Sequence, residues 1–139
     1  MYLLDTNVIS ELRKSGTDRL DPYVRQWAQT VAADDLFISV VTLTELEIGV
    51  LSLERKDPTQ GAHLRTWLDH YVKVHFHGRI LDITAAVALQ FAKMNVPDRV
   101  AVMDGLIAAT AQVHNMMVVT RNVADFSGVA AVNPFQCQL

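Results

Sequence analysis

Four acidic residues stand out because each lies in a short motif at the end of a predicted strand or near the start of a predicted helix: Asp5, Glu45, Asp104 and Asp125. Mg²⁺ and Mn²⁺ prefer oxygen ligands and keep several waters, so carboxylates with open positions between them suit these ions. Two carboxylates about 5 Å apart repel each other by roughly 3 kcal/mol at an effective dielectric constant near 20, and a cation relieves that repulsion. The four acids therefore predict a site for a hard divalent cation.

Three of these acids also have an ordinary structural explanation. Glu45 follows Thr42 at the spacing of a capping box, so it could simply satisfy the start of a helix. Asp104 could be an acid in the first turn of a helix, stabilised by the helix dipole, and Asp125 could be a turn residue. Asp5 is harder to explain in this way, because a carboxylate at the end of a buried strand is unfavourable unless something binds it.

Zinc is a poor candidate for the ion, because zinc sites use histidine and cysteine at regular spacings. The single cysteine, Cys137, cannot form a disulfide within the chain. That pattern is typical of a reducing cytoplasm, which we expect to be the location of the protein. No zinc-like spacing links the five histidines, which are His63, His70, His75, His77 and His114.

Length and composition predict a single domain over residues 1–139, with half of its residues hydrophobic and therefore able to form a substantial core. No apolar run reaches the roughly 18 residues that span a bilayer, and no basic segment precedes an apolar stretch at the N-terminus. We therefore expect neither a membrane anchor nor a signal peptide. The net charge of −3 neither supports nor excludes a nucleic-acid substrate, since four of the 15 acidic residues belong to the predicted metal site.

Short apolar strands alternate with helical patterns along the whole chain. The strands are predicted over residues 2–4, 36–39, 80–83, 116–120 and 129–132. The helices are predicted over residues 8–13 (capped by Thr6 or Asn7), 21–32, 42–53, 63–72, 84–95 and 102–114. This alternation predicts an α/β fold with a short, mainly parallel central sheet and helices on both faces.

The predicted architecture gives the four acids a common location. In open α/β sheets ligands bind outside the carboxyl ends of the strands, usually where the strand order reverses. Asp5 ends the first strand, and Glu45 lies one turn into the helix after the second. Asp104 lies near the start of a later helix, and Asp125 follows the fourth strand. We therefore expect all four side chains to converge on one edge of the sheet.

Four segments carry a resemblance to a known family: LDTNVISE (4–11), SVVTLTELEIG (39–49), DGLIAATA (104–111) and TRNVADF (120–126). Together they resemble the motifs of the PIN-domain nucleases, and specifically of the VapC/FitB-like toxins of bacterial toxin–antitoxin pairs. The similarity runs from about Tyr2 to Phe135 in the order and spacing of that family. The resemblance implies a PIN-like fold.

The resemblance also implies an activity and partners. PIN-domain toxins of this kind are metal-dependent endoribonucleases, here expected to use Mg²⁺ or Mn²⁺. A cognate antitoxin binds the toxin and blocks its site, operator DNA is bound only through the antitoxin, and the toxins commonly form homodimers. Carried over to this chain, the acidic quartet is Asp5, Glu45, Asp104 and Asp125, with Asp5 and Asp104 holding the first metal. Polar residues that orient carboxylates and water would be Thr6, Asn7, Thr120 and Asn122.

Two alternatives of other classes remain open. The chain could be a largely non-catalytic partner in an antitoxin–DNA regulatory complex, with a vestigial metal site. Alternatively, Asp5 could be the nucleophile of a phosphatase of the haloacid-dehalogenase type. Those phosphatases need a second aspartate two residues on, where this chain has Asn7, and a late lysine, whereas the last lysine here is Lys93.

Overall fold

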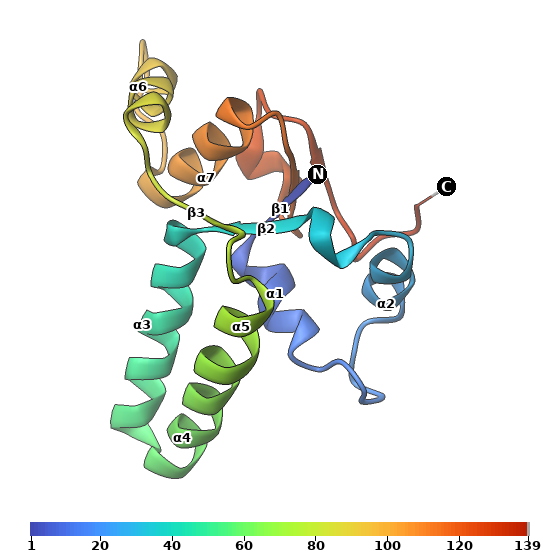
Figure 1. The fold of residues 1–139 in the computed structure, drawn as a ribbon. Helices are drawn as coiled ribbons and strands as arrows, with labels where there is room; N and C mark the ends of the chain where they lie inside the picture. Colours follow the sequence, from blue (N-terminus) through green and yellow to red (C-terminus); the bar gives the residue numbers. More distant parts are fainter. Residues whose placement is uncertain (139) are drawn as a thin grey trace.

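The computed structural model describes residues 1–138, so Leu139, the last residue of the predicted domain, lies outside the described residues. Within residues 1–138 the chain forms a parallel five-stranded sheet in the order β3-β2-β1-β4-β5 (Figure 1). The sheet confirms the predicted α/β class and parallel pairing. The strands are β1 (Tyr2–Leu4), β2 (Leu36–Ser39), β3 (Ile80–Leu81), β4 (Met117–Val119) and β5 (Ala131–Val132).

The strand order reverses next to β1. The chain moves from β1 outward through β2 to β3, and then returns to the other side of β1 to add β4 and β5. Leu3 pairs with Phe37 of β2 on one side and with Val118 of β4 on the other. The switch point of the sheet therefore lies between β1 and β4, and ligands of open parallel sheets bind at the carboxyl ends of such strands.

Helices cover both faces of the sheet, as predicted (Figure 1). One side carries α1 (Thr6–Leu12), α2 (Pro22–Gln29), α3 (Val40–Lys56), α4 (Pro58–Trp67) and α5 (Lys73–His75). The other side carries α6 (Ala85–Met94) and α7 (Val102–Val113). Shorter turns of helix complete the chain: η1 (Ala33–Asp35), the π-helical η2 (Leu68–Val72) and η3 (Val123–Phe126).

Each face of the sheet has its own core, because successive side chains of a strand point to opposite faces. Leu4 of β1 packs with residues of α1, α3 and η2, whereas its neighbour Leu3 packs with residues of α7. Both leucines are fully buried. Burial of one such side chain stabilises the fold by about 1.5–3 kcal/mol, so β1 is anchored from both faces and fixes the position of the residue that follows it.

The predicted starts of two helices are wrong, because the caps are Asp5, which directly follows β1, and Ser39, the last residue of β2. The side chain of Asp5 accepts a hydrogen bond from Thr6 N and caps α1, in place of Thr6 or Asn7. Ser39 caps α3 by accepting from Thr42 N at 3.3 Å, so Thr42 is not the cap and no Thr42–Glu45 capping box opens the helix. Because a cap can follow a strand directly, no loop separates β1 from α1 or β2 from α3.

Several other boundaries differ from the predictions: β3 ends at Leu81, β5 begins at Ala131, and α4 and α2 differ as follows. Asp57 ends α3 and at the same time caps α4, whose first residue is Pro58, so α4 begins before the predicted residue 63. Proline is favoured at the first position of a helix, and this preference prevails here over its role as a helix breaker. The α2 helix ends at Gln29 instead of residue 32, because the Thr30 hydroxyl and amide both donate to Trp27 O.

Over residues 1–138, none of the helices is both long enough and apolar enough to cross a membrane.

Candidate active site

Asp5 is the most buried of the four acids, with 6% of its surface exposed. Its Oδ1 atom accepts from Thr6 N at 2.8 Å. Its Oδ2 atom accepts from the Thr120 hydroxyl at 2.8 Å and from Asn7 Nδ2 at 3.2 Å. Three donors from the ends of β1 and β4 therefore satisfy this carboxylate, which also lies at the favourable N-terminus of α1.

The donors to Asp5 are themselves held in place. The Thr120 hydroxyl oxygen accepts from Asn122 N at 3.0 Å and from Asn7 Nδ2 at 3.4 Å. Asn7 Oδ1 accepts from Arg121 N at 3.1 Å. Thr120 and Asn7, two of the polar residues that the sequence singled out, thus contact the Asp5 carboxylate directly, whereas Asn122 joins this network through its main chain.

Glu45 lies on α3, beyond the end of β2, and is half-buried. Its Oε1 atom accepts from the Thr6 hydroxyl at 2.7 Å. Because the amide of Thr6 also donates to Asp5, this single residue links the acid after β1 to the acid after β2. Thr6, another of the polar residues that the sequence singled out, therefore contacts Glu45 through its hydroxyl.

Asp104 lies in the first turn of α7 and is half-buried. The pKa of its carboxyl is raised, first because burial disfavours the charged form, and then because of the negative charges of Asp5, Asp125 and Glu45. Asp125 is exposed on η3, where its amide donates to Asn122 O. The charges of the other three acids therefore act on Asp104. We call these four residues, at the carboxyl edge of the sheet, the acidic neighbourhood.

These acids suit a hard cation that keeps several of its waters better than a cation held entirely by side chains. In residues 1–138 no group of three or more His, Cys, Asp or Glu side chains is arranged to hold a metal ion directly. Mg²⁺, however, usually binds through one or two carboxylates and keeps several of its waters. A divalent charge in this neighbourhood would also offset the repulsion that raises the pKa of Asp104. The oxygen donors present therefore fit Mg²⁺ or Mn²⁺.

Comparison with known proteins shows the family of this chain. The PIN domain family matches residues 2–132. The chain belongs to the PIN-domain family. It is similar to toxin FitB of Neisseria gonorrhoeae, with 36% identity over 97% of this chain and 99% of FitB. It is also 48% identical to ribonuclease VapC14 of Mycobacterium tuberculosis over 51% of this chain and 66% of that protein.

The solved structure of FitAB bound to an IR36 DNA fragment contains a chain with the same fold. That chain has a TM-score of 0.86 and 32% identity to this PIN domain, over 100% of this chain and 99% of the other. Within the family, these similarities assign the chain to the VapC/FitB-like toxins. This assignment replaces the phosphatase alternative.

One hollow of this PIN domain is lined by none of the four acids. It is a groove of about 590 Å³ between α1, α2 and the η2–α5 segment. Its lining is largely apolar and includes Ile9, Leu12, Trp67, Tyr71 and Phe76. Because α1 contributes to this groove and carries Asp5 at its N-terminus, the groove and the acidic neighbourhood are joined by one short helix.

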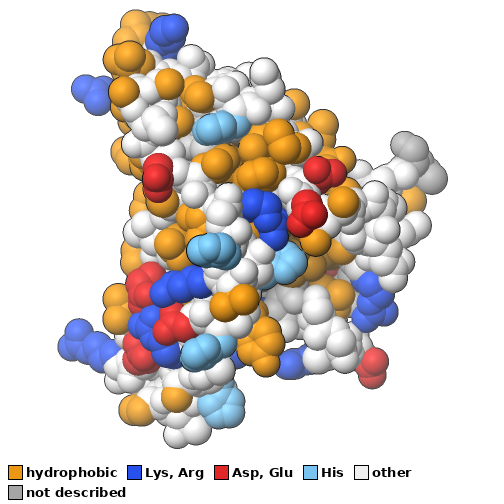
Figure 2. All heavy atoms as spheres, viewed as in Figure 1, with side chains coloured by type: hydrophobic (Ala, Val, Ile, Leu, Met, Phe, Trp, Pro, Cys, Tyr) orange, Lys and Arg blue, Asp and Glu red, His pale blue; other side chains and the backbone are white. Residues whose placement is uncertain are grey.

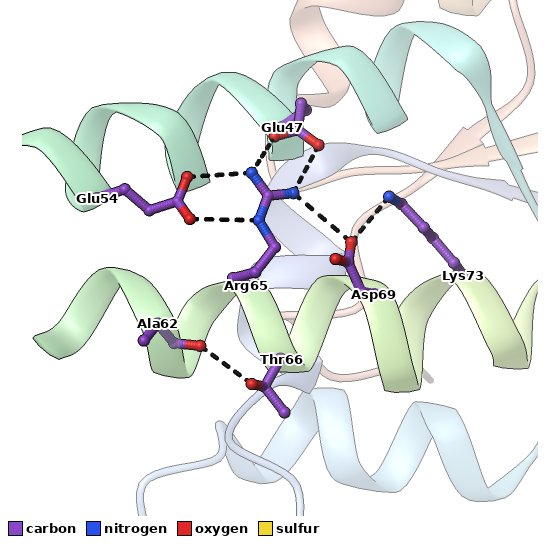
Figure 3. Close-up of polar contacts among 7 residues, drawn as sticks. All are labelled: Glu47, Glu54, Ala62, Arg65, Thr66, Asp69 and Lys73. Atoms are coloured by element: carbon purple, nitrogen blue, oxygen red, sulfur yellow. Dashed lines mark hydrogen bonds and ion pairs between the residues drawn. The ribbon is translucent and has the colours of Figure 1, made fainter. Parts of the chain in front are cut away.

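The helix that carries Glu45 is fastened to α4 by an ion-pair network (Figure 3). Arg65 of α4 binds both carboxylate oxygens of Glu47, at 2.8 and 2.6 Å, and also contacts Glu54 at 3.1 Å. The hydrogen bonds from Arg65 lower the pKa of Glu47. Figure 2 shows red and blue side chains mixed over this part of the surface. The network therefore holds α3 against α4 at Glu47, which is two residues after Glu45.

Sequence reasoning did not assign a role to two residues of this region. Ser39 caps α3. It is a cap-type residue directly before an apolar helix, but Thr42, three residues later, is of the same type and is the predicted start of the helix. Arg121 belongs to the last of the four motifs without an assigned role, yet its amide donates to Asn7 Oδ1. No local pattern predicts that contact, because it joins residues 114 positions apart.

Proposed function

We propose that this PIN domain is the toxin of a type II toxin–antitoxin pair and a metal-dependent endoribonuclease that hydrolyses phosphodiester bonds in RNA. We assign its catalytic acids as Asp5, Glu45, Asp104 and Asp125. The observation that carries the proposal is the common acidic neighbourhood of four residues from four separate segments at the carboxyl edge of the sheet. The names of two relatives, ribonuclease VapC14 and toxin FitB, support the same activity and role.

The proposed cofactor is Mg²⁺, with Mn²⁺ as an alternative, and Asp5 and Asp104 are the residues assigned to hold it with help from Glu45 and Asp125. When bound, such an ion polarises the scissile phosphate and lowers the pKa of a bound water. Thr120 and Asn7 keep the Asp5 carboxylate in one orientation, and Thr6 does the same for Glu45. Glu45 or Asp125 would orient the attacking water and accept its proton.

The proposed partner is a cognate antitoxin that blocks the site and supplies contact with operator DNA. The FitAB structure supports this, since FitAB is bound to DNA in it. The apolar groove beside α1 is a suitable surface for a partner, because Tyr71 on its rim is 66% exposed. Large exposed apolar side chains gathered in one place are typical of interaction sites.

We further propose that the protein is a homodimer. Exposed apolar side chains gather on α6, where Leu89 is 67% exposed, and around the start of α7, where Val102 is 60% exposed. Figure 2 shows this hydrophobic surface over the region of α6. Sedimentation of the purified protein would measure the oligomeric state, and a monomer at all concentrations would contradict the proposal.

The test of the activity is cleavage of a total RNA pool by purified protein freed of antitoxin, with Mg²⁺, Mn²⁺ or EDTA. Asp5→Asn is the test variant, and Asp18→Asn, an exposed aspartate in the loop before α2, is its matched control. We expect discrete fragments that require the metal, persist in Asp18→Asn and vanish in a folded Asp5→Asn. Undiminished cleavage by Asp5→Asn would overturn the assignment of the acids.

A second candidate function is that of a largely non-catalytic partner in an antitoxin–DNA regulatory complex. The observation that favours it is the full-length likeness to FitB in the DNA-bound FitAB structure. Folded protein that cleaves no RNA under any metal condition, but retains specific DNA binding together with its antitoxin, would support this second function and contradict the first.

A further inference from the structure

The main chain of Arg121 is fixed between the acidic neighbourhood and the segment after β5. On one side its amide donates to Asn7 Oδ1 at 3.1 Å, and Asn7 in turn donates to Asp5. On the other side its carbonyl accepts from Asn133 Nδ2 at 3.1 Å. Asn133 Oδ1 accepts from Phe135 N at 2.9 Å, which closes the chain of contacts. Arg121 is therefore held at the carboxyl edge of β4, next to the residue that binds Asp5.

The guanidinium of Arg121 is also held in place, although the side chain is exposed. Its Cζ atom lies 3.8 Å from the centroid of the Phe135 ring. A guanidinium stacked on an aromatic face is stabilised by the cation–π interaction, and its in-plane N–H donors stay available at the edge. The stacking thus orients a planar cation without occupying its donors.

Within residues 1–138, Arg121 has no carboxylate within 4.0 Å, in contrast to the three cations that form ion pairs. Arg65 and Lys73 are paired with acids of the α3–α4 network, and Lys14 is paired with Glu11. The charge of Arg121 helps to lower the pKa of Glu11, but Glu11 already accepts from Lys14 and from Asp21 N. Arg121 is therefore an oriented cation whose donors can take an anion.

We propose that Arg121 is a substrate-binding residue that contacts a phosphodiester of the RNA flanking the scissile phosphate. This inference rests on the proposed endoribonuclease function. Four carboxylates repel the RNA backbone at the reaction site, so an oriented cation at the same edge of the sheet provides the attraction that the acids lack. The planar fork of arginine matches a phosphate with two parallel hydrogen bonds. Its link to Asp5 through Asn7 favours the substrate over an anion bound elsewhere on the surface.

The test compares Arg121→Ala and Arg121→Lys with wild type, and uses Arg19→Ala as a matched control. Arg19 is an exposed arginine in the loop before α2, and its main chain contacts only its own loop. KM and kcat are measured on one short single-stranded RNA over a series of salt concentrations. Binding of the same RNA is measured in the Asp5→Asn background, where no cleavage is expected.

We expect Arg121→Ala to raise KM about tenfold with kcat nearly unchanged, because one charge-assisted phosphate contact is lost. The slope of log KM against log salt concentration should fall by about 0.7, the value for one phosphate of a single strand. Arg121→Lys should restore the salt slope but only part of the affinity, since lysine lacks the planar fork. Arg19→Ala should behave like wild type.

Three outcomes would overturn the inference. If wild type cleaves RNA and Arg121→Ala keeps its KM and salt slope while its melting temperature falls, Arg121 only stabilises the segment that carries Phe135. If Arg121→Ala loses the antitoxin but not the RNA, its partner is an acidic side chain of that protein. If wild type neither cleaves nor binds RNA, the proposed function fails together with the role of Arg121. In the first two outcomes wild type still cleaves RNA, which distinguishes them from this third one.

Discussion

The hydroxyl of Thr120, the residue directly after β4, contacts the carboxylate of Asp5, the residue directly after β1. It donates to Asp5 Oδ2 and accepts from Asn122 N, and both Thr120 and Asp5 are buried. Valine has nearly the same shape but cannot make either bond. We expect Thr120→Val to lower the free energy of unfolding by about 1–3 kcal/mol, because a buried carboxylate loses a donor. Its cleavage rate should fall about 10- to 100-fold, as for other supports of metal ligands.

Thr42 offers the same substitution in a different setting. It is fully buried on α3, and its hydroxyl has no hydrogen-bond partner among the described residues. Thr42→Val should therefore leave stability unchanged or raise it slightly, because removing an unsatisfied hydroxyl removes a desolvation penalty. Urea denaturation of both variants measures the difference. Equal losses in Thr42→Val and Thr120→Val would contradict a special role for the contact with Asp5.

Glu11 is a buried acid outside the acidic neighbourhood, with 7% of its surface exposed. Burial alone raises its pKa, but hydrogen bonds from Asp21 N and Lys14, together with nearby positive charge, lower the pKa below 4.5. A carboxyl with a lowered pKa stabilises the fold above pH 4.5, and this stabilisation is lost as the pH falls through the folded-state pKa. Glu11→Gln should therefore be less stable than wild type at neutral pH.

The difference between Glu11→Gln and wild type should disappear in acid, once Glu11 itself is protonated. Unfolding curves of both proteins across the range from neutral pH to below pH 4.5 would measure this convergence. A constant difference at every pH would show that the glutamine acts through packing instead of charge.

At the scale of elements, α3 and α4 pack so closely that one glycine is required. A Cβ atom on Gly61 of α4 would lie 2.4 Å from Glu54 Cα and 2.7 Å from Glu54 N of α3. Backbone atoms cannot yield as a flexible side chain can. We expect Gly61→Ala to destabilise the protein by about 1–3 kcal/mol, although alanine is the better helix former. Thermal unfolding measures the loss.

Gly49 on α3 is the matched control, since a Cβ atom there meets nothing within 4 Å. Gly49→Ala should stabilise the protein by about 1 kcal/mol through helix propensity alone. Because α3 carries Glu45, Gly61→Ala should also reduce cleavage, whereas Gly49→Ala should not. A stable and fully active Gly61→Ala would contradict close packing of the two helices.

Much of this arrangement could be predicted from the sequence, because the decisive patterns are local. Asp5 directly ends an apolar strand and Asp104 lies in the first turn of an apolar helix, so the carboxyl-edge rule places both. The cap of α3 was predicted wrongly because Ser39 and Thr42 are both cap-type residues three positions apart. The strand order and the contact of Arg121 with Phe135 depend on packing between distant segments, which no short pattern encodes.

At the scale of the whole molecule, the sheet gathers like charges from segments far apart in the sequence. Folding brings Asp104 near Asp5, Asp125 and Glu45, and burial together with their charges raises the pKa of Asp104. The folded state without a cation therefore carries an electrostatic penalty that the unfolded chain does not. The proposed divalent ion would relieve this penalty, so we expect stability to depend on the ion.

Thermal unfolding with and without a divalent ion measures this dependence directly. Mg²⁺ or Mn²⁺ should raise the melting temperature of wild type, because an ion that binds only the folded state stabilises it by about 2.7 kcal/mol at a concentration of 100 times its Kd. Asp104→Asn removes one of the mutually repelling charges, so in EDTA it should melt above wild type. The same variant should gain little from either ion. Asp18→Asn, which lies outside the acidic neighbourhood, should follow wild type in both conditions. A wild-type melting temperature that is the same with Mg²⁺, Mn²⁺ and EDTA would contradict a divalent-ion site at these acids, whatever the RNA assay gives.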